Sequence, residues 1–234
     1  MSARVMSRLA GTLYLVTHVT SVAAVFLYGG SAADPSASPP GRVSVLTGAL
    51  LEIVLAIAIV GTGIALLPLL WRWGRATAGG YLALRALEAS VILAGVVVLL
   101  PLVAQPGTPA DPGLDPAVAD GLRLVHDWTF LVGPGLIVPV HTVLLAWLLW
   151  RRGLAPRVIA ALGLIGGPLV GAMNLAVMFG LTGPVAVLAL PVFAWEVGLA
   201  AYLILRGLPG QPDPDSVDGT PAPDRQPIPV QVGG

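Results

Sequence analysis

Six long apolar stretches run through the chain, and they constrain its fold more than any other feature of the sequence. Each offers about 20 or more mainly apolar residues, the length needed to cross the hydrocarbon core of a bilayer, where only helices and closed barrels satisfy the backbone. The stretches show no strict alternation of polar and apolar residues, so they predict helices. We expect an all-α, polytopic membrane protein, a six-transmembrane-helix bundle built by residues 1–206. The predicted spans are 9–27, 46–70, 81–103, 122–150, 158–181 and 185–205.

The fourth stretch, 122–150, is too long for one perpendicular crossing and too short for two crossings joined by a turn. It contains Gly133-Pro134-Gly135 and Pro139. Proline lacks the backbone N–H that a helix interior uses, so kinks concentrate at such positions. We therefore expect one helix that begins outside the bilayer and bends near one of these sites.

Composition excludes several functions. Hydrophobic residues make up 56% of the chain and charged residues 10%, against about 45–50% and about 25% in soluble domains. The formal net charge is zero, which argues against a nucleic-acid partner. Cysteine is absent, so disulfides, thiol nucleophiles and thiolate metal sites are excluded. The Pro-, Gly- and Asp-rich segment 207–234 predicts a disordered tail.

The arginines predict the orientation, because the chain contains no lysine. Positive residues mark the cytoplasmic side of short loops, which places both termini in the cytoplasm and the protein in the inner (plasma) membrane. One alternative makes the first stretch a cleaved signal peptide that ends at Ser31-Ala32-Ala33. The arginines that define the cytoplasmic side are Arg4, Arg8, Arg72, Arg75, Arg151, Arg152, Arg157 and Arg206.

All three glutamates and all three histidines fall inside predicted spans, together with one aspartate and one well-embedded arginine. An ionised group at mid-bilayer costs about 2.5–3.5 kcal/mol, so such residues are usually functional. At about 1.5 Å per residue they separate into an outer, a middle and a cytoplasmic-side group. The candidate intramembrane polar site is Glu52, His126 and Asp127 in the outer group, His18 and Glu196 in the middle, and Arg85, Glu88 and His141 toward the cytoplasm.

Several of these residues also have a purely structural interpretation. Arg85 and Glu88 are spaced i,i+3, as in an intrahelical ion pair. Arg123 is spaced i,i+4 from Asp127 and would neutralise it. His18 and His141 could equally be hydrogen-bonded core residues.

The faces of the helices are also predictable at about 100° per residue. Asp127 and His141 share one face of the fourth helix, whereas His126 points about 100° away from Asp127, so these neighbours are not expected to act as a catalytic dyad. On the fifth helix, Gly163, Gly167 and Gly171 predict a close-packing surface.

The order of these landmarks resembles a known family. The residues that carry the resemblance are Arg8-Leu9-Ala10-Gly11, Leu51-Glu52, Arg85-Ala86-Leu87-Glu88, His126-Asp127-Trp128-Thr129-Phe130 with Gly133-Pro134-Gly135, Gly163-Leu164-Ile165-Gly166-Gly167-Pro168, and Trp195-Glu196. In this order the chain resembles the bacterial integral-membrane family called domain of unknown function 4386, from about Arg8 to Arg206. The resemblance implies a six-helix bacterial membrane protein and carries over no activity and no catalytic residue.

Four functions stay open from the sequence. Four acids face one or two arginines, so some carboxyls must be protonated or some imidazoles charged. This favours a bundle that binds or transports a small apolar or amphipathic molecule through a proton-titratable site. An enzyme acting on a lipid or isoprenoid would use Glu52 or Asp127 with His126. Haem binding is a third function, but three histidines allow at most one haem, through His18 and one partner. No cofactor or metal is therefore expected. A non-catalytic assembly protein would use the charges to fix helix register.

Overall fold

A computed structural model describes residues 2–28, 41–104 and 114–209. Throughout these ranges the regular structure is helical and no strand occurs. The predicted tail beyond residue 209 and the Ser31-Ala32-Ala33 segment lie outside the described residues. The helices are α1 (Ala3–Leu27), α2 (Arg42–Leu70), α3 (Arg75–Leu99), α4 (Pro101–Ala104), α5 (Pro116–Val132), η1 (Gly133–Ile137), α6 (Val138–Arg152), α7 (Arg157–Met178), η2 (Ala186–Ala189) and α8 (Leu190–Leu205).

Six helical segments of the described chain are long and apolar enough to cross a membrane, which confirms the predicted fold class. Each contains most or all of one predicted apolar stretch. The segments are Ala3–Leu27, Arg42–Leu70, Arg75–Val103, Pro116–Arg152, Arg157–Met178 and Ala186–Leu205.

The fourth segment is one continuous helical run of 37 residues, or about 55 Å at the rise of an α-helix. This is longer than the hydrocarbon core, which is about 30 Å thick. At the position where the sequence predicts a bend, the structure has one turn of π-helix, Gly133–Ile137, between α5 and α6. Single π-helical turns within α-helices are frequent at functional sites.

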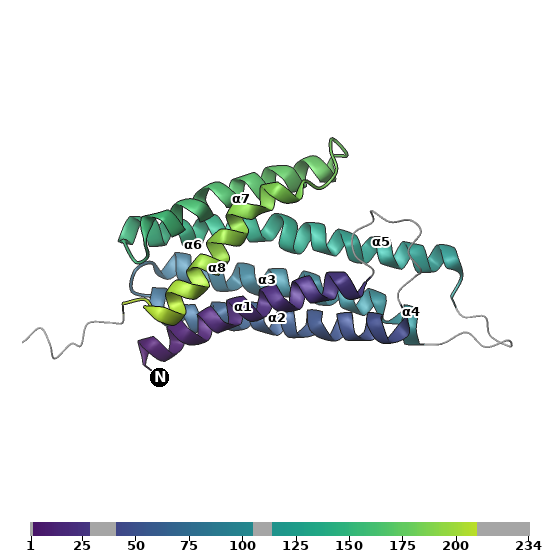
Figure 1. The fold of residues 1–234 in the computed structure, drawn as a ribbon, viewed down its shortest axis with the longest axis horizontal. Coiled ribbons are helices and arrows are strands. Elements are labelled where there is room, and N and C mark those ends of the chain that lie inside the picture. The colour runs from purple at the N-terminus through teal and green to yellow at the C-terminus, as the bar shows by residue number, and fades with distance from the viewer. Residues whose placement is uncertain (1, 29–40, 105–113, 210–234) are drawn as a thin grey trace, which may run out of the picture.

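The six segments form a ring that follows the chain. α1 packs on α2, α2 on α3, α3 on α5 and α6, α6 on α7, and α7 on α8, while α8 returns to pack on α1 (Figure 1). Close approach at the closing contact depends on a small residue, because a Cβ added at Gly11 of α1 would lie 2.6 Å from the backbone oxygen of Ala200 in α8. The ring leaves its centre accessible to side chains from all six segments.

The glycines of α7 pack as the sequence predicts. A Cβ at Gly163 would lie 2.7 Å from the Trp195 ring of α8, and one at Gly167 would lie 2.8 Å from Val143 of α6. At Gly171 it would lie 3.2 Å from Pro139. Small residues of this kind let neighbouring membrane helices approach closely.

The two ends of the bundle differ. At one end, where α1 begins and α8 ends, Leu208 N donates to Ser7 Oγ at 3.1 Å. We call it the arginine-rich end, because Arg72, Arg75, Arg151 and Arg157 lie there, each over a tryptophan ring. The half of the bundle at this end holds most of the larger apolar core, including Leu66, Leu70, Leu145, Leu149 and Leu203.

Candidate functional site

Every glutamate of the chain is paired with a different histidine. Each pair joins two helices, and each unites residues that the sequence places at the same depth. The outer pair links α2 to α5, the second links α3 to α6, and the third links α1 to α8. The pairs are Glu52 Oε1 with His126 Nε2 at 3.1 Å, Glu88 Oε2 with His141 Nε2 at 3.0 Å, and Glu196 Oε2 with His18 Nε2 at 3.2 Å.

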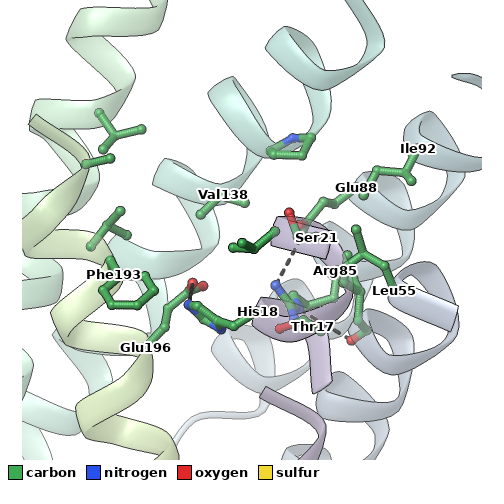
Figure 2. A pocket seen from close by; sticks show the side chains of 16 residues that line it. Thr17, His18, Ser21, Leu55, Arg85, Glu88, Ile92, Val138, Phe193 and Glu196 are labelled. Carbon is green, nitrogen blue, oxygen red and sulfur yellow. Dashed lines mark hydrogen bonds and ion pairs between the residues drawn. The ribbon is translucent and has the colours of Figure 1, made fainter. Parts of the chain in front are cut away.

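A cavity of about 320 Å³ lies at the centre of the ring and is lined from all six segments. Its charged lining residues are His18, Arg85, Glu88 and Glu196, which Figure 2 shows around one space. The rest of the wall is largely apolar and includes Leu55, Ile92, Val138, Val192 and Phe193. Four of the eight candidate residues therefore converge on a single cavity.

Arg85 is held deep in the wall of this central cavity, with its side chain only 2% exposed. Its Nη1 donates to Glu88 Oε2 at 3.0 Å and its Nε donates to Thr62 Oγ1 at 3.1 Å. The guanidinium also lies over the Tyr14 ring, 5.4 Å from the centroid. The intrahelical ion pair with Glu88 is thus present, and His141 joins it through Glu88, with His141 Nε2 3.0 Å from Glu88 Oε2.

His18 differs from the other two histidines in its hydrogen bonds. Its Nδ1 lies 2.9 Å from the backbone oxygen of Tyr14, which can only accept, so Nδ1 carries a proton. Its Nε2 faces the Glu196 carboxyl. A neutral imidazole with Nδ1 protonated has only a lone pair at Nε2. The contact with Glu196 therefore requires one further proton, held either by the imidazole or by the carboxyl.

The other two pairs do not need an additional proton. His126 Nδ1 is 3.7 Å from Asp127 Oδ1, beyond hydrogen-bonding distance. His141 Nδ1 has no hydrogen-bond partner among the described residues. In both cases the neutral tautomer with a proton on Nε2 donates directly to its glutamate. The shared extra proton is therefore a property of the His18–Glu196 pair.

The Glu52–His126 pair is separated from the central cavity. Its carboxyl is 1% exposed, and neither residue lines the central cavity. Between it and Arg85 lies a buried apolar cluster of Leu55, Ala56, Ile59, Ala89 and Ile92. An enzyme that used Glu52 would need a path through this cluster to reach the cavity.

Asp127 lies outside the central cavity. Its side chain is 77% exposed and lines a second pocket of about 450 Å³ beside Asn174. The expected neutralisation by Arg123 is wrong, because Arg123 Nη1 instead binds Asp120 Oδ1 at 2.8 Å, one turn earlier on the exposed helix surface. The expectation that Asp127 shares a face with His141 is also wrong, because the π-helical turn between them changes the register of the helix.

Two tyrosine contacts were not predicted from the sequence. The hydroxyls of Tyr14 and Tyr81 form a hydrogen bond between α1 and α3. Tyr28 packs edge-on against His126, with ring centroids 5.2 Å apart. Tyr14 occupies the same face of α1 as Gly11 and His18, so its spacing was the available signal; the sequence offered none for Tyr28.

The ring of apolar helices and its polar interior define the class of protein: a polytopic α-helical membrane protein with a pocket lined from all six long helical segments. The family described as Domain of unknown function (DUF4386) matches residues 9–207. The chain belongs to this family. No curated protein and no solved structure matches the chain.

Proposed function

We propose that the protein binds a small amphipathic molecule in the central cavity, and that binding or transport is linked to the proton shared by His18 and Glu196. The observation that carries this proposal is the hydrogen bonding of His18, which requires that proton at the cavity wall. The cavity volume of about 320 Å³ lies within the range of ligand sites, about 300–1,000 Å³. The π-helical turn of the fourth segment also supports it, since such turns are frequent at functional sites and Pro134 of this turn lines the cavity.

The absence of cysteine provides a direct test of the cavity. Ser21 lines it, whereas Ser7 is fully buried at the arginine-rich end. In proteoliposomes, Ser21→Cys should react with methyl methanethiosulfonate, and Ser7→Cys, the matched control, should react much more slowly. Three aromatic probes cover the charge classes: benzyltrimethylammonium, benzenesulfonate and neopentylbenzene. At least one probe should slow the reaction of Ser21→Cys and drive proton movement across the membrane, detected by pyranine inside the proteoliposomes. If no probe slows the reaction and none drives proton movement, the proposal fails.

A second candidate is a non-catalytic assembly protein whose three Glu–His pairs fix the helix register. The complete pairing of the glutamates favours it, because buried ionic groups can specify one packing arrangement. In that case, Glu196→Gln should lower stability, while no probe should protect Ser21→Cys. The two candidates therefore give opposite results in the same assay.

We also propose that the arginine-rich end faces the cytoplasm of the inner membrane, with both termini on that side. The support is the distribution of arginines under the positive-inside rule. A reporter fused after residue 234 that is active only in the cytoplasm should be active. Activity of a periplasmic reporter at the same position would reverse the orientation.

A further inference from the structure

The charge facing the central cavity comes from three helices and is simple to sum. α3 contributes Arg85 and Glu88, which neutralise each other, while α1 contributes His18 and α8 contributes Glu196. α2 and α7 contribute no charged lining residue. Once Arg85 and Glu88 cancel, the counter-charge left for Glu196 among the described lining residues is the proton that it shares with His18. If that proton leaves, the cavity carries one negative charge.

The titratable groups packed around this site do not alter the sum. His141 of α6 stands behind Glu88 as its hydrogen-bond partner. Tyr14 of α1 and Tyr81 of α3 are bonded to each other through their hydroxyls. Neutral phenols and a neutral imidazole add no charge.

The negative group is also the one that a ligand would reach. The Glu196 side chain is 17% exposed, compared with 2% for Arg85. Two of the three guanidinium nitrogens of Arg85, Nη1 and Nε, already donate to Glu88 and Thr62. A molecule entering the cavity thus meets a carboxylate before it meets a guanidinium.

An aromatic ring lies beside this carboxylate. Phe193 also lines the cavity, one turn before Glu196 on α8 (Figure 2). Its ring packs edge-on against His18, with centroids 5.1 Å apart. An organic cation is attracted to an aromatic face as well as to a carboxylate, and the apolar wall suits a hydrophobic body.

From this arrangement we propose that the ligand of the central cavity is an organic cation with an apolar body, and that it replaces the proton shared by His18 and Glu196. This rests on the proposed function, and it assigns a chemical class to the ligand. One cation enters and one proton leaves, so the net charge of the cavity is the same before and after exchange. His18 becomes a neutral imidazole, and the cation takes over as the counter-charge of Glu196.

Benzyltrimethylammonium tests this exchange because a quaternary ammonium ion has no proton of its own to release. Titration calorimetry on the full chain in nanodiscs, in two buffers of different ionisation enthalpy, should count about one proton released per cation bound. Affinity should rise about tenfold per pH unit while the pair holds its proton, and level off above that range. Neopentylbenzene, which has the same shape without the charge, should bind more weakly and release no proton.

Single substitutions in the natural sequence, without an introduced cysteine, separate the roles of His18 and Glu196. Glu196→Gln should weaken cation binding at least about 30-fold, the lower end for losing one partner of a buried charge pair. His18→Gln should still bind the cation, but the pH range over which a proton is released should shift, because Glu196 then holds that proton alone. Asp120→Asn, which changes an exposed carboxylate outside the cavity, should behave as wild type. Helical content by circular dichroism should be equal in all variants.

Two results would overturn the inference and leave the proposed function standing. Tighter binding of benzenesulfonate than of benzyltrimethylammonium would assign the site to anions and to Arg85. Equal binding of the cation and neopentylbenzene, with no proton released, would show that the charge of the ligand does not contribute to its recognition. If no probe binds, both the inference and the proposed function fail.

Discussion

Removing Arg85 should destabilise the bundle strongly, because the residue is the fixed positive charge of the buried network. In Arg85→Met, the Glu88 carboxyl, 4% exposed, keeps only His141 at 3.0 Å. Thr62 Oγ1 loses the donor that lies 3.1 Å away. Breaking a buried ion pair by removing one partner costs about 3–5 kcal/mol, because the other charge stays buried without compensation.

The companion substitution makes this prediction specific. In the double variant Arg85→Met/Glu88→Met both charges are gone, so the cost should fall well below that of Arg85→Met alone. The coupling energy from the cycle should be at least about 1 kcal/mol. Equilibrium unfolding in mixed micelles of dodecyl maltoside and sodium dodecyl sulfate would measure each free energy of unfolding.

An exposed ion pair provides the matched control. Arg123 and Asp120 are also three residues apart, but their side chains are 47% and 77% exposed. Arg123→Met should change stability by less than about 1 kcal/mol, as usual for surface pairs. If Arg85→Met costs no more than Arg123→Met, or if the double variant is as unstable as the sum of its parts, the reasoning about the buried network is refuted.

Three further predictions concern packing and the outer pair. Gly166→Ala should lower the free energy of unfolding by about 1–3 kcal/mol, because the added Cβ would lie 2.6 Å from the backbone nitrogen of Val192. Gly121→Ala is the control, because no atom lies within 4 Å of the added Cβ, and it should not lower the free energy of unfolding. Equal effects of the two substitutions would contradict the α7–α8 contact. Tyr81→Phe should cost about 1 kcal/mol through the lost hydroxyl bond to α1, and no measurable change in unfolding would argue against that bond. Glu52→Gln should cost about 1 kcal/mol by exchanging a charged for a neutral hydrogen bond, while calorimetry should show unchanged benzyltrimethylammonium affinity; a large loss would connect this pair to the cavity.

Much of the fold could be predicted from the sequence because lipid permits few solutions. Apolar stretches of sufficient length form helices in lipid, and the Gly-Pro-Gly segment, one of the two sites where the sequence predicts a bend, is where the structure has the π-helical turn Gly133–Ile137. The constant helix rise then sorted the ionisable residues by depth. The structure pairs Glu52 with His126, and Glu88 with His141, within the depth groups so obtained.

The partner choices themselves could not be predicted, because they depend on which helices are neighbours. Only the return of α8 to α1 brings Glu196 to His18. Register was also hidden: the wider π-helical turn separates the face of Asp127 from that of His141. The extra proton emerged only when both ring nitrogens of His18 had assigned neighbours.

The most direct test of the central claim is the protonation state of His18. The chain has three histidines, so ¹⁵N-histidine NMR of the protein in bilayers resolves few signals, and single His→Gln variants would assign them. We predict that the imidazole holds the shared proton, so that the His18 signal changes from imidazolium to neutral imidazole as pH rises, and that benzyltrimethylammonium shifts it to the neutral form at a pH where it is charged. His126 and His141 should not respond to this probe. A His18 signal that stays in one state from about pH 5 to 9, or that ignores every probe that binds, would contradict a proton-linked cavity.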